Sequence, residues 1–368
     1  MTNKVLCIAL LLIASLTAAK AQNDITEKPR ISGYFIGQYQ AVMKDEDQSN
    51  GFNIRIARLA ADGILKGDFA YKIQGQVSGN VSSLGSSVRL VDAFAEWQRY
   101  NFLKVKLGQF KRPFTFENPM NPIDQGFMGY AQAINNLAGF NDRTGCHASN
   151  GRDIGLQLQG DVKLWNTSIH YQVGVFNGQG INTKDMDSKK DLIGGVWVTP
   201  LKGFRIGAFG WTGTYARTGN SIDAQGNTIS GTRSLRQNRY ALGAEYKEGG
   251  WQVRSEYIHS TGWGFTTSHQ QADDAKKNDI KYDMGNKADG IYALLIAPCI
   301  NNKLRLKVRY DLYRKAARWS SARTQYEIGM NYSACKNVEL QAEYALVNDR
   351  SLTNHYFNLI DCELCVRF

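Results

Sequence analysis

The feature that most constrains the fold is an alternation of charged and apolar side chains along extended segments. Between Lys303 and Leu312, every odd position is charged and every even position is Leu, Val or Tyr. Successive side chains of a β-strand point to opposite faces, so one face of this segment suits lipid and the other does not. After residue 21, no window has the run of about 20 apolar residues that a membrane-spanning helix needs. Such a chain can cross a membrane only as a closed β-barrel, which pairs every backbone N–H and C=O between strands.

Sixteen segments are predicted to be strands, and their connections alternate in length. Connections after odd-numbered strands are mostly long, such as Gly264 to Lys287, and those after even-numbered strands are short, such as Leu164 to Trp165. The predicted strands are 30–43, 51–64, 68–80, 87–99, 101–110, 151–163, 166–177, 189–199, 203–216, 234–247, 250–263, 288–299, 303–314, 322–334, 337–348 and 357–368. This is the plan of bacterial outer-membrane barrels. The sequence therefore predicts an all-β fold, a transmembrane antiparallel β-barrel of 16 strands with both termini on the periplasmic side.

The longest connection, residues 111–150, has the composition of a folded segment. Its large apolar side chains are Phe114, Phe116, Phe127, Met128, Tyr130, Ile134, Leu137 and Phe140. A solvated linker contains few such groups, and a loop of this length is usually functional or disordered. In an antiparallel barrel, a segment of this kind can fold into the lumen. We expect residues 111–150 to be an inward-folded third extracellular loop that narrows the channel as a constriction loop.

The N-terminus, residues 1–21, has the pattern of a secretory signal peptide. Lys4 precedes an apolar core from Val5 to Leu16, and Ala19-Lys20-Ala21 has the small-x-small form of a cleavage site. The alternative, a membrane anchor, needs about 20 apolar residues, and this core has only about 12. We predict cleavage near Ala21 and a single barrel domain over residues 22–368. The expected location is the outer membrane of a Gram-negative bacterium.

The strongly basic charge of the chain indicates a path for anions. The formal net charge is +11, and removal of Lys4 and Lys20 with the signal peptide leaves about +9. A charge on the lipid face of a barrel costs about 2–4 kcal/mol at the midplane, so charged strand residues should face the lumen, where basic rings favour anions. The candidates on strands are Arg55, Lys104, Lys106, Lys303, Arg305, Lys307 and Arg309, and those at or near the long loop are Lys111, Arg112, Arg143 and Arg152.

A second interpretation of the same cations stays open. They could form ion pairs with lumenal carboxylates and hold the barrel wall together without serving transport. Possible partners are Asp92, Glu96, Glu256, Glu343 and Glu363. If every lumenal cation is paired in this way, no charge remains to attract an anion.

Several motifs in the N-terminal half carry a family resemblance. The stretch Gly108 to Glu117 (GQFKRPFTFE) is followed by Gly151 to Gly155 (GRDIG), and Phe52 to Gly63 (FNIRIARLAADG) and Val91 to Trp97 (VDAFAEW) precede both. In this order they resemble the phosphate-selective porin O and P family. The C-terminal half resembles the family only in its strand pattern.

The resemblance implies a passive pore, small anions such as phosphate as solutes, and assembly as a homotrimer. It also implies that lysine or arginine near the long loop replaces the hydration of phosphate-like anions with charge-assisted hydrogen bonds. Glu117, Asp124 and Asp142 in the same loop would weaken that field. A last strand that ends in Phe368 resembles the signal by which the barrel-assembly machinery recognises its clients.

Other classes of function find little support in the sequence. The chain has no G-x-S-x-G, P-loop or H-E-x-x-H motif, and its five His are scattered, so we expect no enzyme, no metal site and no cofactor. Basic stripes interleaved with stacking aromatics, the mark of nucleic-acid binding, are missing as well. The expected partners are small anions and outer-membrane lipid. The alternatives to an anion-preferring porin are an unselective general porin and a plugged barrel with a structural or partner-binding role.

Overall fold

The structure is a computed structural model that describes residues 28–45, 47–65, 67–78, 88–141, 143–144, 149–223, 225–267, 277–301 and 303–368. The predicted signal peptide and its cleavage site lie outside these ranges, as do Asp142 and residues 145–148 of the long loop. No helix within these ranges is long and apolar enough to cross a membrane.

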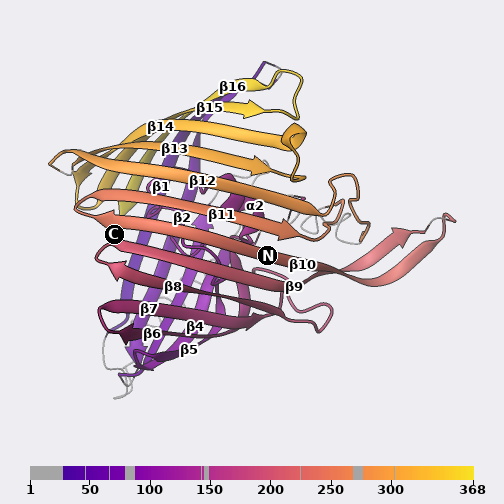
Figure 1. Cartoon of the computed structure of the whole chain (residues 1–368), viewed down its shortest axis with the longest axis horizontal. Coiled ribbons are helices and arrows are strands. Elements are labelled where there is room, and N and C mark those ends of the chain that lie inside the picture. The colour runs from indigo at the N-terminus through magenta and orange to yellow at the C-terminus, as the bar shows by residue number, and fades with distance from the viewer. Residues whose placement is uncertain are drawn as a thin grey trace.

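Sixteen antiparallel strands in the described residues form one closed barrel (Figure 1), which confirms the predicted fold class. The strands are β1 (Arg30–Met43), β2 (Ser49–Leu65), β3 (Phe69–Ser78), β4 (Arg89–Tyr100), β5 (Leu103–Lys111), β6 (Arg152–Leu164), β7 (Thr167–Phe176), β8 (Asp191–Leu201), β9 (Phe204–Ile222), β10 (Thr228–Glu248), β11 (Trp251–Thr261), β12 (Lys287–Ile300), β13 (Leu304–Arg314), β14 (Ala322–Cys335), β15 (Val338–Asp349) and β16 (Tyr356–Arg367). Each pairs with its neighbours in the sequence, and β16 pairs with β1. Gly33 and Phe368 exchange two backbone hydrogen bonds of 2.9 and 3.1 Å at this closure.

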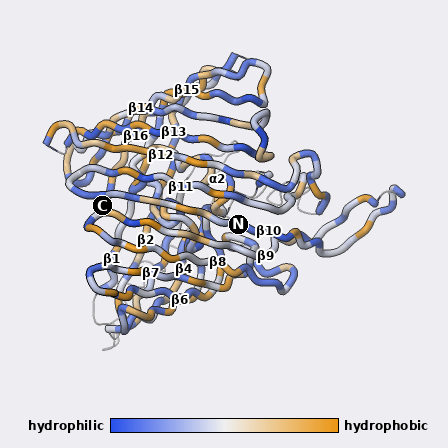
Figure 2. The backbone as a smooth tube through the Cα atoms, in the orientation of Figure 1, coloured by the Kyte–Doolittle hydropathy of each residue, from blue (hydrophilic) through white to orange (hydrophobic). Residues whose placement is uncertain are grey.

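The alternation in the sequence separates the two faces of the wall. On β13, Leu306 and Val308 are 49% and 45% exposed, whereas Lys307 and Arg309 are buried. The same change of polarity from one residue to the next runs along the strands in Figure 2. The apolar residues therefore form the outer surface, and the charged residues point into the barrel.

The hairpin of β9 and β10 is longer than predicted and projects beyond the rest of the barrel (Figure 1). The predicted loop from Thr218 to Arg233 was wrong, because most of it is paired strand. This stretch is rich in Gly, Ser, Thr and Asn and has no apolar face to reveal a strand. Cross-strand contacts stabilise it, for example the 2.7 Å hydrogen bond between the hydroxyls of Thr218 and Thr232.

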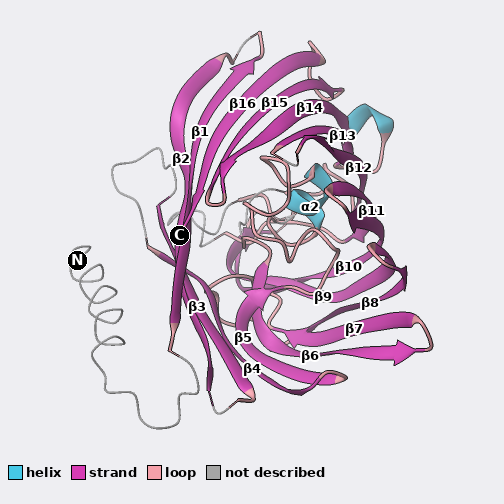
Figure 3. Cartoon of the chain, turned by 90° about the vertical axis from the view of Figure 1, so that its left-hand side faces the viewer, coloured by secondary structure: helices cyan, strands magenta, loops and turns pink. Residues whose placement is uncertain are grey.

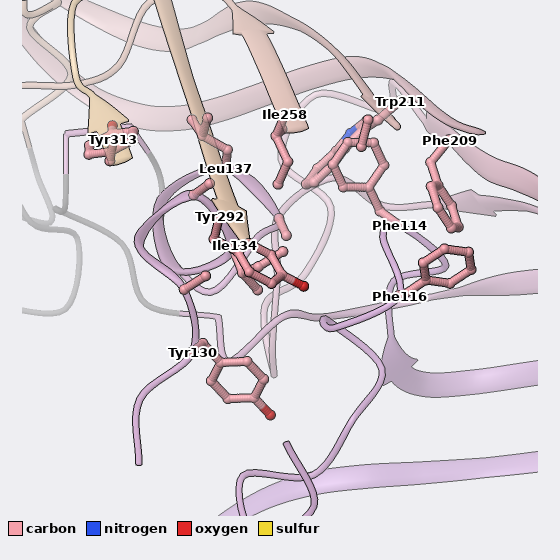
Figure 4. Close-up of a cluster of buried hydrophobic side chains, with 14 of the residues drawn as sticks. Phe114, Phe116, Tyr130, Ile134, Leu137, Phe209, Trp211, Ile258, Tyr292 and Tyr313 are labelled. Carbon is pink, nitrogen blue, oxygen red and sulfur yellow. The ribbon is translucent and has the colours of Figure 1, made fainter. Parts of the chain in front are cut away.

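The segment between β5 and β6 contains a short helix, α2 (Gln132–Leu137), that the sequence pattern did not reveal. In Figure 3, α2 lies beside β11 and β12. Phe114, Phe116, Ile134 and Leu137 of this segment are buried in one cluster with side chains of β9, β11 and β12 (Figure 4). These apolar groups explain why so long a connection has a defined conformation.

Candidate functional site: a basic chamber beside the long loop

Carboxylates of the barrel wall accept hydrogen bonds from the backbone of the long loop. Glu256 on β11 accepts from the N–H groups of Phe116 and Glu117, at 2.6 and 2.9 Å. Farther along the loop, the N–H of Met128 donates to Glu343 at 2.8 Å, and that of Gln132 donates to Asp311 at 2.8 Å. Strands β11, β13 and β15 therefore each hold the loop backbone through a carboxylate.

Cations of the same wall hold loop carbonyls and carboxylates. Arg309 donates to the carbonyl of Gly129 at 2.8 Å, and Lys307 donates to that of Gly126 at 3.1 Å. Arg254 forms an ion pair with Glu117 at 3.1 Å, and Arg367 forms one with Asp124 at 2.6 Å. Two of the three carboxylates of the loop, Glu117 and Asp124, are thus compensated by cations of β11 and β16.

A chamber of about 230 Å³ lies between the loop and strands β3 to β7. Its lining is Lys72, Asp92, Phe94, Lys106, Phe110, Lys111, Pro113, Pro119, Asn121, Arg152, Gln157, Gln159 and Gln172. Four of these residues are basic and one is a carboxylate, so the chamber has an excess of positive charge. Walls of low dielectric concentrate such a field and raise the local concentration of anions.

Three of the chamber's cations are paired with carboxylates. Arg152 makes a bidentate contact with Asp92, at 2.6 and 3.2 Å, and Lys72 lies 4.0 Å from the same carboxylate. Lys106 forms an ion pair with Glu96 at 2.8 Å and lies 4.9 Å from the centre of the Phe94 ring. These pairs fix the positions of the cations and cancel much of their charge.

Lys111 is held by neutral acceptors instead. Its ammonium group donates to the carbonyl of Asn118 at 2.7 Å, to the carbonyl of Met120 and to the Tyr130 hydroxyl at 2.8 Å. Burial raises the pKa of Tyr130, which keeps this hydroxyl neutral. Among the described residues, no carboxylate lies within ion-pair distance of Lys111, so it differs from the other three cations of the chamber in having no ion-pair partner.

Arg58 on β2 is a second cation without an ion-pair partner among the described residues, and the sequence interpretation missed it. It is buried, and its guanidinium donates to the Tyr34 hydroxyl at 2.9 Å and to Gln76 at 3.1 Å. Arg58 and Arg55 are three residues apart, so simple alternation would place their side chains on opposite faces of β2. The register between β1 and β2 skips Arg55, however, and this bulge breaks the alternation.

Lys72 was also missed, although a signal for it was present. It alternates on β3 with Gln74, which is buried, so the same strand pattern that identified Lys104 and Lys106 could have identified it. Lys104 lies two residues before Lys106 on β5, is half-buried and pairs in register with Gln159.

The other candidate residues lie away from the chamber. On β13, Arg305 forms an ion pair with Glu339, Lys307 with Glu343, and Arg309 with Glu327 at 2.5 Å, and on β2 Arg55 forms one with Glu363 at 2.7 Å. Lys303 is exposed in the turn before β13 and so is not part of the strand ladder that was expected. Four of these five cations therefore fit the second interpretation, in which lumenal ion pairs hold the barrel wall together.

Arg112 and Arg143 hold the two ends of the long loop. The Arg112 guanidinium forms an ion pair with Asp153 at 2.9 Å and donates to the carbonyl of Gly139 at 3.1 Å. The Arg143 guanidinium donates to the carbonyls of Gly285 and Lys287, at 3.0 and 2.8 Å. Both arginines are buried. Of the eleven predicted residues, the structure gathers Lys106, Lys111 and Arg152 in the chamber lining.

A second, larger space of about 440 Å³ lies between α2 and strands β13 to β16. Its charged lining is Arg309, Lys315, Arg323, Glu327, Glu343, Asp349 and Asp361. Three cations face four carboxylates there, so this space lacks the positive excess of the chamber.

A closed barrel with an apolar outer surface and a charged interior defines the class of outer-membrane porins. The family described as phosphate-selective porin O and P matches residues 30–285. The chain belongs to this family, as the motifs at residues 108–117 and 151–155 had suggested. Porins are channels rather than enzymes. A search of the curated proteins found no match.

Solved structures share the fold at low sequence identity. The chain is similar to an anion-selective porin from Comamonas acidovorans, with 16% identity, a TM-score of 0.63 and coverage of 92% of this chain and 99% of that chain. It is also similar to the outer membrane channel DcaP of Acinetobacter baumannii, with 12% identity, a TM-score of 0.57 and coverage of 93% and 97%. A trimer form of OmpT from Vibrio cholerae gives 12% identity, a TM-score of 0.57 and coverage of 92% and 99%.

Proposed function

We propose that this porin is a passive channel for small solutes that prefers anions, with phosphate or similar anions among them. The observation that carries the proposal is the lining of the chamber, in which four basic residues face one carboxylate and Lys111 has no ion-pair partner. The similarity to an anion-selective porin agrees with it.

The long loop, residues 111–150, is the constriction of this channel and folds into the lumen. Its hydrogen bonds to carboxylates of β11, β13 and β15 support this arrangement, because the acidic side chains of these strands point into the barrel. The ion pairs of Glu117 and Asp124 compensate two of the three acidic charges of the loop, which would otherwise oppose an anion. Solutes then pass between the loop and strands β3 to β7.

Transport through this passage rests on weak contacts in series. The basic groups raise the anion concentration at the chamber, and the amides of Gln157, Gln159 and Gln172 replace part of the hydration shell. Most of the cations already have partners, so each contact is weak enough for the anion to leave again. Lys106, Arg152 and Lys111 are the pore residues that we assign to this path.

Three further parts of the proposal concern assembly. Residues 1–21 are a signal peptide that is removed near Ala21. The barrel-assembly machinery recognises the C-terminal strand that ends in Phe368, the residue that closes the barrel against Gly33. The mature chain forms a homotrimer, as the trimer form of OmpT from Vibrio cholerae suggests.

The test is the reversal potential of the purified protein in a planar bilayer under a potassium chloride gradient, repeated with phosphate. We expect a potential set by chloride and a chloride current that phosphate reduces. A potential set by potassium, or an unselective one, would show that the cations serve only the wall. An absence of conductance would favour the plugged barrel.

A further inference from the structure

We propose that the space of about 440 Å³ between α2 and strands β13 to β16 is a binding site for short zwitterionic peptides. This inference goes beyond the proposed function, because it concerns a second space and a solute without net charge. It depends on charged groups of both signs that line one space, have no ion-pair partner and lie at different depths.

Asp361 on β16 is the carboxylate that receives the ammonium group of such a solute. It lines the space, is half-buried, and accepts hydrogen bonds from the side-chain amides of Gln38 at 2.8 Å and Gln40 at 3.0 Å. Within the described ranges, no cation lies within ion-pair distance of Asp361. It is therefore the counterpart of Lys111, because both are lumenal charges that only neutral groups hold. An ammonium group can donate to Asp361 without displacing a cation of the protein.

Arg323 on β14 is the cation that receives the carboxylate of the solute. Its guanidinium lies 5.7 Å from the centre of the Phe357 ring, and no carboxylate of the described chain is within ion-pair distance of it. Arg309, which lines the same space, is by contrast paired with Glu327 at 2.5 Å. A guanidinium without a carboxylate partner can offer two parallel N–H donors to a solute.

The separation of these two charged groups sets the length of the solute. Phe357 and Asp361 lie on the same face of β16 and are four residues apart, which is about 13 Å along a strand. The Arg323 guanidinium lies beside Phe357, so the two charges of a matching solute are on the order of 10 Å apart. An extended tripeptide has about this length, whereas the charges of a free amino acid are only about one residue apart.

Side-chain amides elsewhere in the lining suit the peptide groups of such a solute. The amide nitrogens of Asn135 and Asn136 on α2 donate to the carbonyls of Tyr130 and Gln132, at 3.1 and 2.8 Å. Their amide oxygens consequently remain as acceptors for the N–H groups of a peptide. Both asparagines are half-buried and line the space, so a solute within it can reach them.

The experiment measures the binding of trialanine to the purified full-length mature protein in detergent at pH 7, by a ligand-observed NMR titration. Three related solutes test the two charges and their spacing. N-acetyl-trialanine lacks the ammonium group, trialanine amide lacks the carboxylate, and free alanine has both charges close together. We expect trialanine to bind about tenfold more tightly than each of these three.

Variants assign the binding to this space. In Asp361→Asn, which keeps an oxygen for Gln38 and Gln40, the affinity for trialanine should fall about tenfold, to that of the N-acetyl form. The matched control Asp161→Asn removes a carboxylate of β6 outside this space and should keep the full affinity. Lys111→Met should keep it as well, because Lys111 lines the chamber and not this space.

Equal binding of trialanine and its N-acetyl form to the unmodified protein would overturn the inference, and this criterion needs no variant. Full affinity in Asp361→Asn, or a loss of affinity in Lys111→Met, would place the peptide elsewhere and overturn it too. Free alanine that binds as tightly as trialanine would contradict the spacing of the two charges. The reversal potential under a potassium chloride gradient tests the proposed function separately, so either proposal can fail without the other.

Discussion

The two spaces beside the long loop contain similar numbers of cations, yet only one has an excess of positive charge. In the space bounded by β13 to β16, Arg309 has Glu327 on the neighbouring strand, and the carboxylates outnumber the cations. In the chamber bounded by β3 to β7, Asp92 serves two cations, and Lys111 has only carbonyl and hydroxyl oxygens. Whether a lumenal cation stabilises the wall or attracts a solute therefore depends on the group with which the cation is paired.

The pairing on the β13 side depends on a glycine. Lys307 lies in register with Gly329 on β14, which lies in register with Glu343 on β15, so the ion pair between Lys307 and Glu343 spans an intervening strand. A Cβ at Gly329 would approach the Glu343 side chain to 2.8 Å and the Lys307 side chain to 3.0 Å. The missing side chain thus gives the two charged groups room to meet.

Removal of Arg309 should have the largest effect, because its role is structural. In Arg309→Met, Glu327 would remain buried without its cation, and the carbonyl of Gly129 would lose a donor. Loss of one partner from a buried pair costs about 3–5 kcal/mol, so we expect a large decrease in the free energy of unfolding. Urea unfolding in detergent, followed by tryptophan fluorescence, measures this change.

The double variant Arg309→Met/Glu327→Gln is the control for this prediction. It removes both charges and should recover most of the lost stability, because no uncompensated carboxylate remains. Equal stability of the single variant and the unmodified protein would mean that the β13 pairs do not hold the wall, and the contrast between the two spaces would fail.

Removal of Lys111 should change selectivity more than stability. Lys111→Met deletes a basic group that has no ion-pair partner, while preserving much of the apolar volume of the side chain. We expect the ratio of chloride to potassium permeability to fall on the order of tenfold, because a focused field acts on the local ion concentration. The reversal potential under a salt gradient reports this ratio. The matched control is Lys307→Met/Glu343→Gln, which removes a neutralised pair and should leave the ratio within about twofold.

Removal of Glu96 should raise the chloride preference, the opposite of the effect expected for the removal of Lys111. In Glu96→Gln, Lys106 loses its carboxylate partner but keeps the Phe94 ring 4.9 Å from its nitrogen. The chamber gains a second lysine without an ion-pair partner, and we expect the chloride preference to rise about threefold. The same bilayer measurement detects it. A fall in chloride preference would show that Lys106 needs Glu96 to face the solute path.

The sequence predicted those parts of the fold that depend on alternation. The segment around Lys307 and Arg309 shows a polar and an apolar face without any knowledge of its neighbours, and the closed barrel follows from sixteen such segments. The extended hairpin between Thr218 and Arg233 was missed because both of its faces are polar. Pairing between strands, rather than a hydrophobic face, determines its structure.

The candidate site was less predictable, because it depends on register. Whether Lys307 meets Glu343 is decided by the position of Gly329 two strands along, and Arg58 lies on the inner face only because of a bulge opposite β1. Neither is visible in a single strand. Lys106 was found because a charge in a barrel wall has no other place to go than the lumen. Lys111 and Arg152 were found because they lie at the two ends of the long loop.

The smallest expected effect concerns Tyr130, which accepts a hydrogen bond from Lys111. Burial raises the pKa of Tyr130 above its ordinary value of about 10. A raised pKa of an acid means that the folded state favours the neutral form, so its contribution to stability is complete below about pH 10 and is lost as the pH rises toward the folded-state pKa.

We expect Tyr130→Phe to lower stability by about 1 kcal/mol at neutral pH, because Lys111 loses one acceptor. Above pH 10, the unmodified protein should lose stability more steeply than the variant, since only it has a buried phenol to ionise. Unfolding temperatures of both proteins between pH 7 and pH 11 measure this difference, and parallel curves over that range would mean that the Tyr130 hydroxyl is accessible to solvent in the folded protein.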